Sequence, residues 1–384
     1  MEETLNKILP DLKRIRKELH QNPELSQLEY NTANRIIKYL TNHSKATVSK
    51  VANTGVVATF DSGIEGKCIL LRADIDALPI IETNEFEYKS NLHAVSHKCG
   101  HDGHTAIMLG VASLLSEHPI KNGKVVLLFQ PAEENGMGAK AVLNDNLFQK
   151  LQFDFVYALH NIPGIKKNQI VIKENTFNAN VKSMIIKLEG KTAHAAEPEK
   201  GHNPALALAD ILHYSEKETH NYPQENSFFL ITPVHINMGE IAYGISAGYA
   251  ELHLTIRSWD LALFDEKCNG LENFVKHTCN TYGLKESISW TQVFYANKNN
   301  PSAIDILRKA ALANKFEVHE MSHSFKWGED FGLFTQKYKG AMFGLGAGEN
   351  TPALHNPDYD FPDDITATGI HQFFQIIQQI NKTK

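Results

Sequence analysis

The stretch HTAIMLGVASLLSEHPIKNGKVVLLFQ, residues 104–130, joins a helical pattern to a short run of apolar residues. The run KVVLLFQ at 124–130 lacks the alternation of a strand with one exposed face, so it is typical of a strand buried on both faces. Three other runs share this character: TGVVATF at 54–60, KCILLRAD at 67–74 and FDFVYALHN at 153–161. Such strands, separated by helices, predict a mainly parallel sheet in an α/β fold.

Helices are predicted at both ends of the chain. Apolar residues at helical spacing precede Pro23, and they are Leu12, Ile15 and Leu19. Ser26-x-x-Glu29 resembles a capping box that would open a second helix. The last helix is predicted from another set of spaced apolar residues, namely Ile370, Phe373, Phe374, Ile377 and Ile380.

The pattern changes between residues 180 and 288. SMIIKLEGKTAHA at 183–195 and AELHLTIRSWD at 250–260 alternate polar and apolar residues, and a helical pattern follows each of them. Alternation predicts strands with one side facing solvent or a partner, and therefore an α+β unit. At 384 residues the chain is also longer than a typical single domain. We predict a discontinuous main domain, 1–179 plus 289–384, with a smaller α+β domain inserted at 180–288.

Composition excludes some classes of partner. Hydrophobic residues make up 42% of the chain and charged residues 21%, as in ordinary globular proteins. The net charge of −6 gives no electrostatic reason to expect nucleic acid or an anionic membrane surface. The N-terminus lacks the apolar core of a signal peptide, and no run reaches the roughly 18 apolar residues of a spanning helix. We therefore expect a cytoplasmic protein.

Cysteine usage points to metal chemistry rather than to disulfides. The four cysteines, at 68, 99, 268 and 279, are too few and too irregularly spaced for a disulfide framework. Cys99 is the only one of the four that lies among several polar residues, in KCGHDGH at 98–104. Cys99 and His101 offer a thiolate and an imidazole that are both credible zinc or manganese ligands. Asp102 is placed to orient one of these ligands.

Further candidate ligands follow the predicted strands. Glu133 and Glu134 come just after the strand 124–130, His160 ends the strand 153–161, and His355 follows a glycine-rich turn. An adjacent acidic pair is usually a solvated turn, and a single histidine is usually structural. Here the location favours a site, because open α/β sheets bind ligands beyond the carboxyl ends of their strands.

The number of candidate ligands suggests two metal ions. Five donors suffice for two ions if one donor and a water bridge them, and the five are Cys99, His101, Glu134, His160 and His355. Paired ions roughly 3.5–4 Å apart are a recognised hydrolytic device, since they acidify a bridging water and polarise a carbonyl. Glu133 is not needed as a ligand, so it is free to take the proton of the water and pass it to the leaving nitrogen.

At this point the chain resembles a known family, the dinuclear-metal amidohydrolases and aminoacylases among the peptidases. The branch is that of hippurate hydrolases, indole-acetyl-amino-acid hydrolases, N-acyl-amino-acid amidohydrolases and N-acetyldiaminopimelate deacetylases. The matching segments run in the family's order along almost the whole chain: LHQNPELS, RADIDALPI, HKCGHDGHTAIMLG, LLFQPAEENGMGAKAVL, ALHN, GKTAHAAEPEKGHNP and LGAGENTPALHNPDYDF.

The resemblance implies a fold and a set of roles. The main domain would be a metallopeptidase-like catalytic domain, and the inserted domain would be a lid through which the protein forms a homodimer. The five donors would bind two divalent ions, Zn²⁺ or Mn²⁺, with Cys99 as a bridging thiolate and Glu133 as general base. His194 would stabilise the oxyanion across the dimer. Arg257 would bind the substrate carboxylate, unless it only forms a surface salt bridge, and Asp76 would orient a metal-binding imidazole.

Two segments depart from the family pattern near the expected substrate cleft. They are IAYGISAGYAEL at 241–252 and WGEDF at 327–331, where many relatives have Ser-Glu-Asp-Phe. For this reason the acyl group and the amino acid cannot be transferred from any one relative. The predicted reaction is hydrolysis of an N-acyl amino acid, with an N-acetyl or aromatic acyl group, to a carboxylate and a free amino acid.

Three other functions compete with this one. A dipeptidase or carboxypeptidase is the nearest, because the same water attacks any amide. A serine hydrolase is suggested by GISAG at 244–248, with Ser246 as nucleophile, but that motif needs a helix next and a strand pattern follows. A metal-stabilised binding protein without turnover would have no use for Glu133 beside the ligands.

Overall fold

The computed structural model describes residues 2–225 and 227–382, and the chain divides into two compact units. The first unit comprises Met1–Phe177, Asn297–Ser322 and Glu329–Lys384, and the second comprises Asn178–Ala296 and His323–Gly328. Each unit has its own cluster of buried apolar side chains.

The first unit is built on an eight-stranded sheet in the order β1-β2-β4-β3-β5-β16-β6-β15. Its strands are β1 (Thr47–Val51), β2 (Gly55–Asp61), β3 (Cys68–Asp74), β4 (Lys124–Gln130), β5 (Phe155–Pro163), β6 (Ile170–Ile172), β15 (Val318–Glu320) and β16 (Gly340–Gly348). The four central strands, β4, β3, β5 and β16, are parallel to one another. This arrangement confirms the predicted α/β fold with a mainly parallel sheet.

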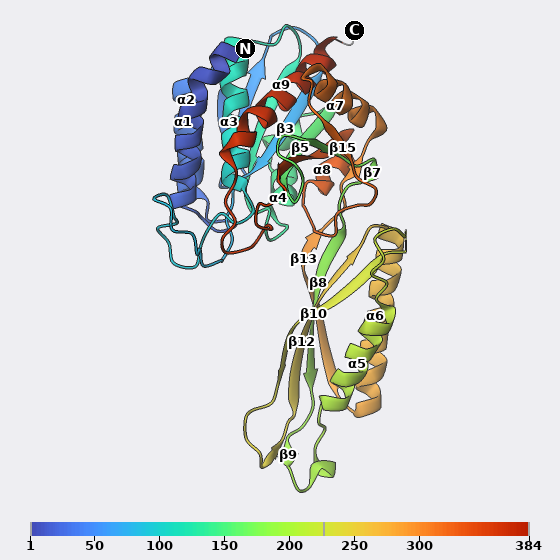
Figure 1. Ribbon diagram of the computed structural model, residues 1–384. Coiled ribbons are helices and arrows are strands. Elements are labelled where there is room, and N and C mark those ends of the chain that lie inside the picture. The colour runs from blue at the N-terminus through green and yellow to red at the C-terminus, as the bar shows by residue number, and fades with distance from the viewer. Residues whose placement is uncertain (1, 226, 383–384) are drawn as a thin grey trace. The chain divides into compact units, whose positions relative to one another are not determined.

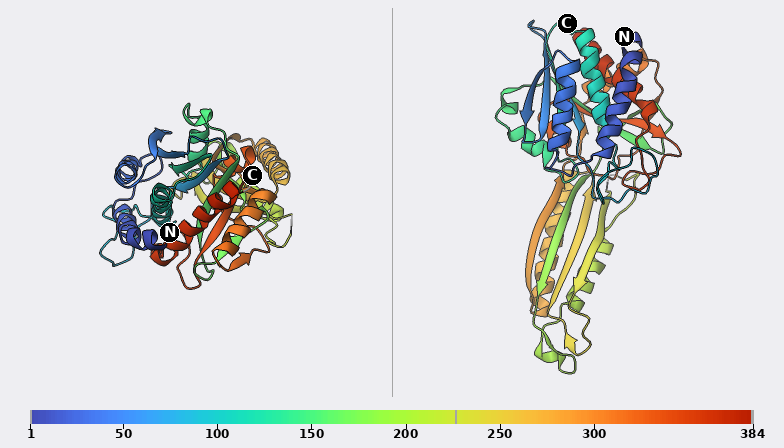
Figure 2. Two further views of the ribbon diagram at one scale, coloured as in Figure 1. Left: turned by 90° about the horizontal axis from the view of Figure 1, so that it is seen from above. Right: turned by 90° about the vertical axis from the view of Figure 1, so that its left-hand side faces the viewer.

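Helices of the first unit accompany this sheet. They are α1 (Glu2–Gln21), α2 (Tyr30–His43), α3 (His101–Glu117), α7 (Pro301–Ala313) and α9 (Thr366–Lys382), with the short α4 (Gly138–Asn144) and α8 (Gly332–Lys337). The helix α3 is buried along nearly its whole length and contacts α1, α2 and α9 as well as β3. Figure 2 shows α1, α2 and α3 side by side. Because α3 is almost entirely apolar after its first turn, it can sit inside this layer and hold its N-terminus at the sheet edge.

The second unit is an antiparallel sheet with two helices on one face. The strands lie in the order β10-β12-β8-β13, and they are β8 (Asn180–Glu189), β10 (Phe229–Met238), β12 (Tyr249–Ser258) and β13 (Lys285–Phe294). The helices α5 (Ala205–Glu218) and α6 (Leu261–Tyr282) pack on the face formed by alternate residues of β8 and β12. The second unit also contains a pair of two-residue strands, β9 (Ala193–His194) and β11 (Ile245–Ser246). A similar pair in the first unit is formed by β7 (Asn175–Thr176) and β14 (Lys298–Asn299).

The sequence placed the end of the inserted domain at residue 288, whereas β13 continues to Phe294 within the second unit. This strand is almost entirely solvated on one face, so its apolar residues are too few to mark its end in the sequence. The role of this unit as a lid and dimerisation domain stays a prediction.

The prediction of a capping box at Ser26 and Glu29 is wrong. The helix α2 begins at Tyr30 with Glu29 as its N-cap residue, and the Glu29 side chain does not cap it. The Ser26 hydroxyl donates instead to Asp76 Oδ2 at 2.7 Å, and Glu29 accepts the backbone N–H of Ala132 at 2.8 Å. Both side chains are used by contacts that are distant in sequence, and a local capping pattern cannot reveal such contacts.

Across the described part of the chain, no helix combines the length and the hydropathy that crossing a lipid bilayer requires.

Candidate metal centre

Titratable side chains gather at the edge of the sheet where the parallel strands end. Asp74 is the last residue of β3, and Glu133 and Glu134 follow β4. His160 lies near the end of β5, and His101 opens α3. Parallel strands bring their carboxyl ends to one edge, so residues far apart in sequence meet there.

The structure brings together all five residues predicted as metal ligands. Cys99 forms one close group with His101 and His160, and a second with Glu134 and His355; within each group the potential ligand atoms lie within 4.8 Å of one another. Cys99 Sγ is 3.4 Å from His160 Nε2. Glu134 carboxylate oxygens are 3.8 Å from His101 Nε2 and 3.7 Å from His355 Nε2. Cys99 is shared by these two groups, as the predicted bridging thiolate would be.

The orientation of the donors fits divalent cations. His101 Nδ1 lies 3.0 Å from the Asp76 carbonyl oxygen, and His160 Nδ1 lies 2.9 Å from the Asn161 carbonyl oxygen. A carbonyl oxygen only accepts, so each Nδ1 donates a proton to it, which makes each Nε2 the nitrogen that is available to a metal. His101 Nε2 and Glu134 Oε1 are buried and have no hydrogen-bond partner among the described residues. Thiolate, imidazole and carboxylate together suit zinc or manganese.

Burial makes the charged forms of these donors unfavourable by themselves. Desolvation, followed by the Glu134 and Glu133 carboxylates, raises the pKa of the Cys99 thiol well above its usual value. Desolvation also raises the pKa of Glu134 to about 8, against the attraction of His101. It lowers the pKa of His160 well below its usual range. Cations bound among these groups would offset the desolvation, because a thiolate and carboxylates are stabilised by positive charge.

Asp76 lies beside the imidazole of His101, one of the predicted ligands. Its Oδ1 is 3.2 Å from His101 Nδ1, and its Oδ2 accepts the backbone N–H of Glu134 at 3.0 Å. Burial opposes protonation of His101, but the Asp74 and Asp76 carboxylates outweigh burial and raise the pKa of His101 to about 10. One carboxylate thus supports two donor residues.

The prediction that Asp102 orients a ligand is wrong. Its Oδ2 is 2.9 Å from His20 Nδ1 and accepts from Arg16 Nη1 at 3.3 Å, so its partners are in α1. A helical residue beside a ligand points to another face of the helix, and here that face meets α1. Asp102 therefore anchors the first turn of α3 to its neighbouring helix.

A buried guanidinium that the sequence analysis missed lies behind the site. Arg72, in the middle of β3, donates to Asp74 Oδ2 at 2.6 Å, to Glu329 Oε1 at 2.8 Å and to Asp330 Oδ1 at 2.8 Å. Two acids of the WGEDF segment, Glu329 and Asp330, therefore form buried ion pairs with this arginine and do not lie in a solvated loop. The sequence offered one signal for this cluster, which is a charged residue inside an apolar strand. Because burying an unpaired charge costs too much free energy, such a residue must have acidic partners.

Glu133 lies among other acids and beside His101. Its carboxylate lies within 4.8 Å of those of Glu329 and Asp330, and 3.9 Å from His101 Nε2. Burial, followed by Glu329 and Glu134, raises the pKa of Glu133 well above its usual value. A buried carboxyl group with increased proton affinity suits proton transfer.

His104 and Asn161 form a second missed pair. His104 Nδ1 is 2.6 Å from Asp74 Oδ1, and its Nε2 contacts the Asn161 side chain. Gly100 has a φ of +94°, and a Cβ there would meet Asn161, so only glycine fits next to Cys99. Both residues stood inside the motifs that contain Cys99 and His160, and their side chains contact each other.

His194 and Arg257 belong to the second unit. His194 is exposed on β9, and its Nδ1 accepts the backbone N–H of Ala196 at 3.1 Å. Arg257 is half-buried on β12, and its Nη1 donates to the Lys326 carbonyl at 2.8 Å. Desolvation lowers its pKa, and no carboxylate of the described residues forms an ion pair with it. The surface salt bridge is therefore not formed, while the substrate roles of both residues stay predictions.

Ser246 lacks the setting of a serine nucleophile. It ends β11, which pairs with β9, and the strand β12 follows rather than a helix. The strand–turn–helix context of a nucleophile elbow is therefore missing.

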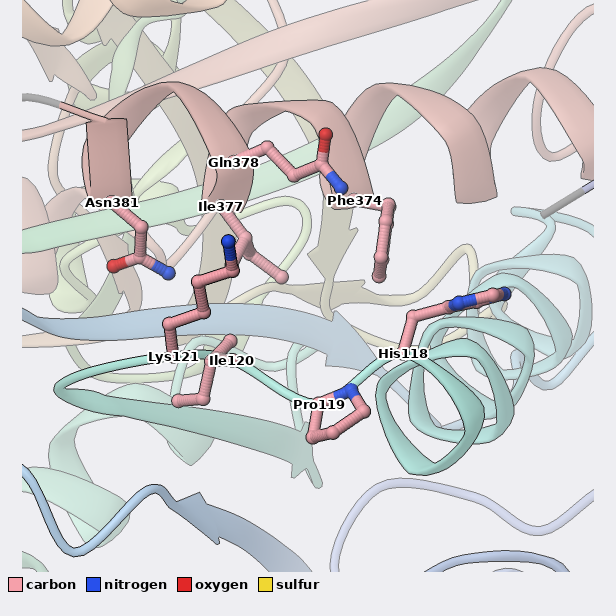
Figure 3. A pocket seen from close by; sticks show the side chains of 8 residues that line it. All are labelled: His118, Pro119, Ile120, Lys121, Phe374, Ile377, Gln378 and Asn381. Carbon is pink, nitrogen blue, oxygen red and sulfur yellow. The ribbon is translucent and has the colours of Figure 1, made fainter.

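A cavity of about 320 Å³ lies away from these donors (Figure 3). It is lined by residues after the end of α3 and from α9: His118, Pro119, Ile120, Lys121, Phe374, Ile377, Gln378 and Asn381. His101 is at the opposite end of α3, which at 1.5 Å per residue is about 25 Å long. None of the five donors lines this cavity.

Comparison with known proteins now decides the family. Residues 70–379 match the family described as Peptidase family M20/M25/M40. The chain belongs to this family. The predicted resemblance is thereby confirmed, and this member of the family is a metal-dependent amide hydrolase.

Relatives of this peptidase-family chain include several deacylases. It is 32% identical to a hippurate hydrolase of Campylobacter jejuni over 372 residues, which cover 95% of each chain. It is 32% identical to an N-acetyl-L-cysteine deacetylase of Bacillus subtilis over 333 residues, which cover 86% of this chain and 79% of the relative. An N-acetyldiaminopimelate deacetylase of Bacillus subtilis is 29% identical over 364 residues, with 94% and 96% covered.

Solved structures share the fold of this family member. A Bacillus subtilis protein described as a dinuclear metal binding peptidase from the M20 family superposes with a TM-score of 0.83 at 24% identity, covering 99% of this chain and 100% of its own. A putative aminohydrolase from methicillin-resistant Staphylococcus aureus superposes with a TM-score of 0.86 at 24% identity, covering 98% and 97%.

The buried His20 provides a test of the contacts that anchor α3. Burial opposes its protonation, but hydrogen bonds with Asp102 and Glu82 prevail and raise its pKa to about 9, from 6.5 when exposed. A raised folded-state pKa contributes stability that is complete below about pH 6.5 and is lost as the pH rises through about 9. We expect the stability advantage of wild type over His20→Gln to shrink by up to about 3 kcal/mol across this window.

Chemical denaturation at several pH values measures this difference. The exposed His319, replaced by Gln, serves as the control, and its difference from wild type stays constant with pH. A constant difference for His20→Gln as well would show that this imidazole is not held in the charged form.

Proposed function

We propose that this protein hydrolyses N-acyl amino acids, with an N-acetyl or aromatic acyl group, to a carboxylate and a free amino acid. One observation carries the proposal: Cys99, His101, Glu134, His160 and His355 converge, and the carboxyl group of Glu133 lies beside them without being needed as a ligand. The relatives named hippurate hydrolase, N-acetyl-L-cysteine deacetylase and N-acetyldiaminopimelate deacetylase support this substrate class.

The five donors would hold two divalent cations, Zn²⁺ or Mn²⁺. When bound, such a pair polarises the amide carbonyl and makes a water molecule more acidic. His101 and His160 supply Nε2 lone pairs, and the Glu134 carboxylate lies within reach of both His101 and His355. Asp76 keeps the His101 ring and the Glu134 backbone in position.

Glu133 would move the proton. Its carboxylate accepts a proton from the attacking water and then gives it to the amide nitrogen, so that the amine can leave. The raised pKa of Glu133, caused by burial and by Glu329, favours taking up this proton. Because Glu133 points toward Glu329 and His101 rather than to solvent, the proton stays within the site.

We further propose a homodimer formed through the second unit, in which His194 of the partner subunit stabilises the oxyanion. Support comes from the GKTAHAA segment and from the exposure of His194, which leaves it accessible to another molecule. Arg257 would bind the substrate carboxylate, since a guanidinium can pair with it through two hydrogen bonds. A cytoplasmic location also stays a prediction.

A substrate panel tests the proposed function. The metal-loaded protein is incubated with N-acetyl, N-benzoyl and indole-acetyl amino acids, with dipeptides as controls, and the free amino acid released is measured. We expect hydrolysis of at least one acylated class, its loss after chelation, and its return with Zn²⁺ or Mn²⁺, because the metals activate the water. Hydrolysis of dipeptides alone, or activity that resists chelation but is lost with a serine-reactive phosphonate, would contradict the proposal.

Replacement of Glu133 separates proton transfer from metal binding. Glu133→Gln keeps the size of the side chain, so metal content stays near wild type while kcat falls by about 100- to 10,000-fold. The exposed Glu65→Gln is the control and keeps wild-type kcat. Metal analysis and steady-state kinetics decide the outcome. Loss of both metal and fold in Glu133→Gln would show that the roles of Glu133 and Glu134 are assigned wrongly.

A further inference from the structure

Ala132, immediately before the two glutamates of the site, has a left-handed backbone. Its φ is +53°, a region unfavourable for alanine because Cβ crowds the following carbonyl. Its carbonyl accepts from the backbone N–H groups of Met137 at 3.2 Å and Gly138 at 2.9 Å, which close the turn itself. Its own N–H donates to Glu29 Oε1 at 2.8 Å. Glu29 is therefore the partner that holds this turn from outside.

Glu29 is buried, and its hydrogen bonds all come from neutral donors. Its exposed fraction is 0%, and no Lys, Arg or His within the described residues forms an ion pair with it. Oε1 also accepts the N–H of Gln27 at 2.9 Å, and Oε2 accepts the Thr54 hydroxyl at 2.7 Å. Gln27 is itself left-handed, with a φ of +70°. One buried carboxylate thus holds two unfavourable backbone conformations, which justifies the cost of its burial.

The same segment supports the turn at a second point. Ser26 Oγ donates to Asp76 Oδ2 at 2.7 Å, and that oxygen accepts the backbone N–H of Glu134 at 3.0 Å. The N–H groups on both sides of Glu133 are therefore fixed by the loop that precedes α2, directly at Ala132 and through Asp76 at Glu134.

We propose that Glu29 is a positioning residue for the reaction: its carboxylate holds the left-handed turn at Ala132 and thereby sets the directions in which Glu133 and Glu134 project. The proposal rests on the proposed function, in which Glu134 binds metal and Glu133 moves a proton. Without this contact, Ala132 relaxes to a negative φ, and the two glutamates that follow turn away from His101 and His355.

Three variants separate geometry from charge. Glu29→Ala is expected to weaken Mn²⁺ binding and to lower kcat, each by about 10- to 100-fold, with KM changed far less. Glu29→Gln is expected to stay near wild type in both, because its carbonyl oxygen accepts the two backbone N–H groups and its amide donates to Thr54. Adding Ala132→Gly to Glu29→Ala is expected to restore most of the loss, since glycine adopts the left-handed region without help.

Equilibrium Mn²⁺ binding, steady-state kinetics and thermal unfolding are measured together. Glu24→Ala is the matched control: Glu24 lies in the same loop and accepts the backbone N–H groups of Asn31 and Thr32 at the start of α2, not that of Ala132. It lowers the unfolding temperature but leaves kcat and Mn²⁺ affinity unchanged. Should Glu29→Ala not fold, Glu29→Asp gives the same expectation, because its carboxylate is one methylene too short.

Wild-type Mn²⁺ affinity and kcat in Glu29→Ala would overturn the proposal. Losses in Glu29→Gln as large as those in Glu29→Ala, or equal losses in Glu24→Ala, would overturn it too. The Mn²⁺ binding measurements do not depend on which substrate the protein hydrolyses. If wild type binds Mn²⁺ and Glu29→Ala binds it weakly, but no N-acyl amino acid is hydrolysed, then the proposed function fails and the positioning role of Glu29 holds.

Discussion

The excess of buried negative charge at one edge of the parallel sheet is the constraint on which the rest of this structure depends. Asp74, Glu133, Glu134, Glu329 and Asp330 meet there with little access to water. Carboxylates this close repel one another, and burial removes the water that would screen them. Arg72 offsets part of the repulsion by pairing with three of them. The remainder calls for further cations, and the donors Cys99, His160 and His355 surround the place where those cations would sit.

Residues next to the donors hold the donor side chains or their backbone in position. Asp76 fixes His101 and the Glu134 backbone, the Asn161 carbonyl fixes His160, and the Lys98 carbonyl accepts the backbone N–H of His355 at 2.7 Å. Each support comes from a buried residue of the first unit. A donor held in this way loses little freedom when a metal binds, which is how proteins achieve tight and specific sites.

The strand ends and the convergence of the candidate ligands could be predicted from the sequence, whereas most supporting contacts could not. Apolar runs such as KVVLLFQ mark the strands, and ligands at parallel strand ends must converge, so the positions of Glu134 and His160 followed directly. Asp102 and the pair Ser26 and Glu29 were misassigned because local patterns were read as local contacts. Their contacts with His20, Asp76 and Ala132 join residues that lie 50 or more positions apart in the chain. Arg72 was visible as a charge in an apolar strand, but its partners Glu329 and Asp330 lie 257 and 258 residues further on.

The number and position of bound metal ions test the central claim most directly. Anomalous diffraction from crystals of the Mn²⁺-loaded protein locates each ion independently of any assay. We predict two ions per chain, each about 2.0–2.3 Å from its ligands, with Cys99 Sγ shared and His101, His160, Glu134 and His355 completing the set. A single ion, or ions bound to other residues while these five donors stay without metal, would contradict it.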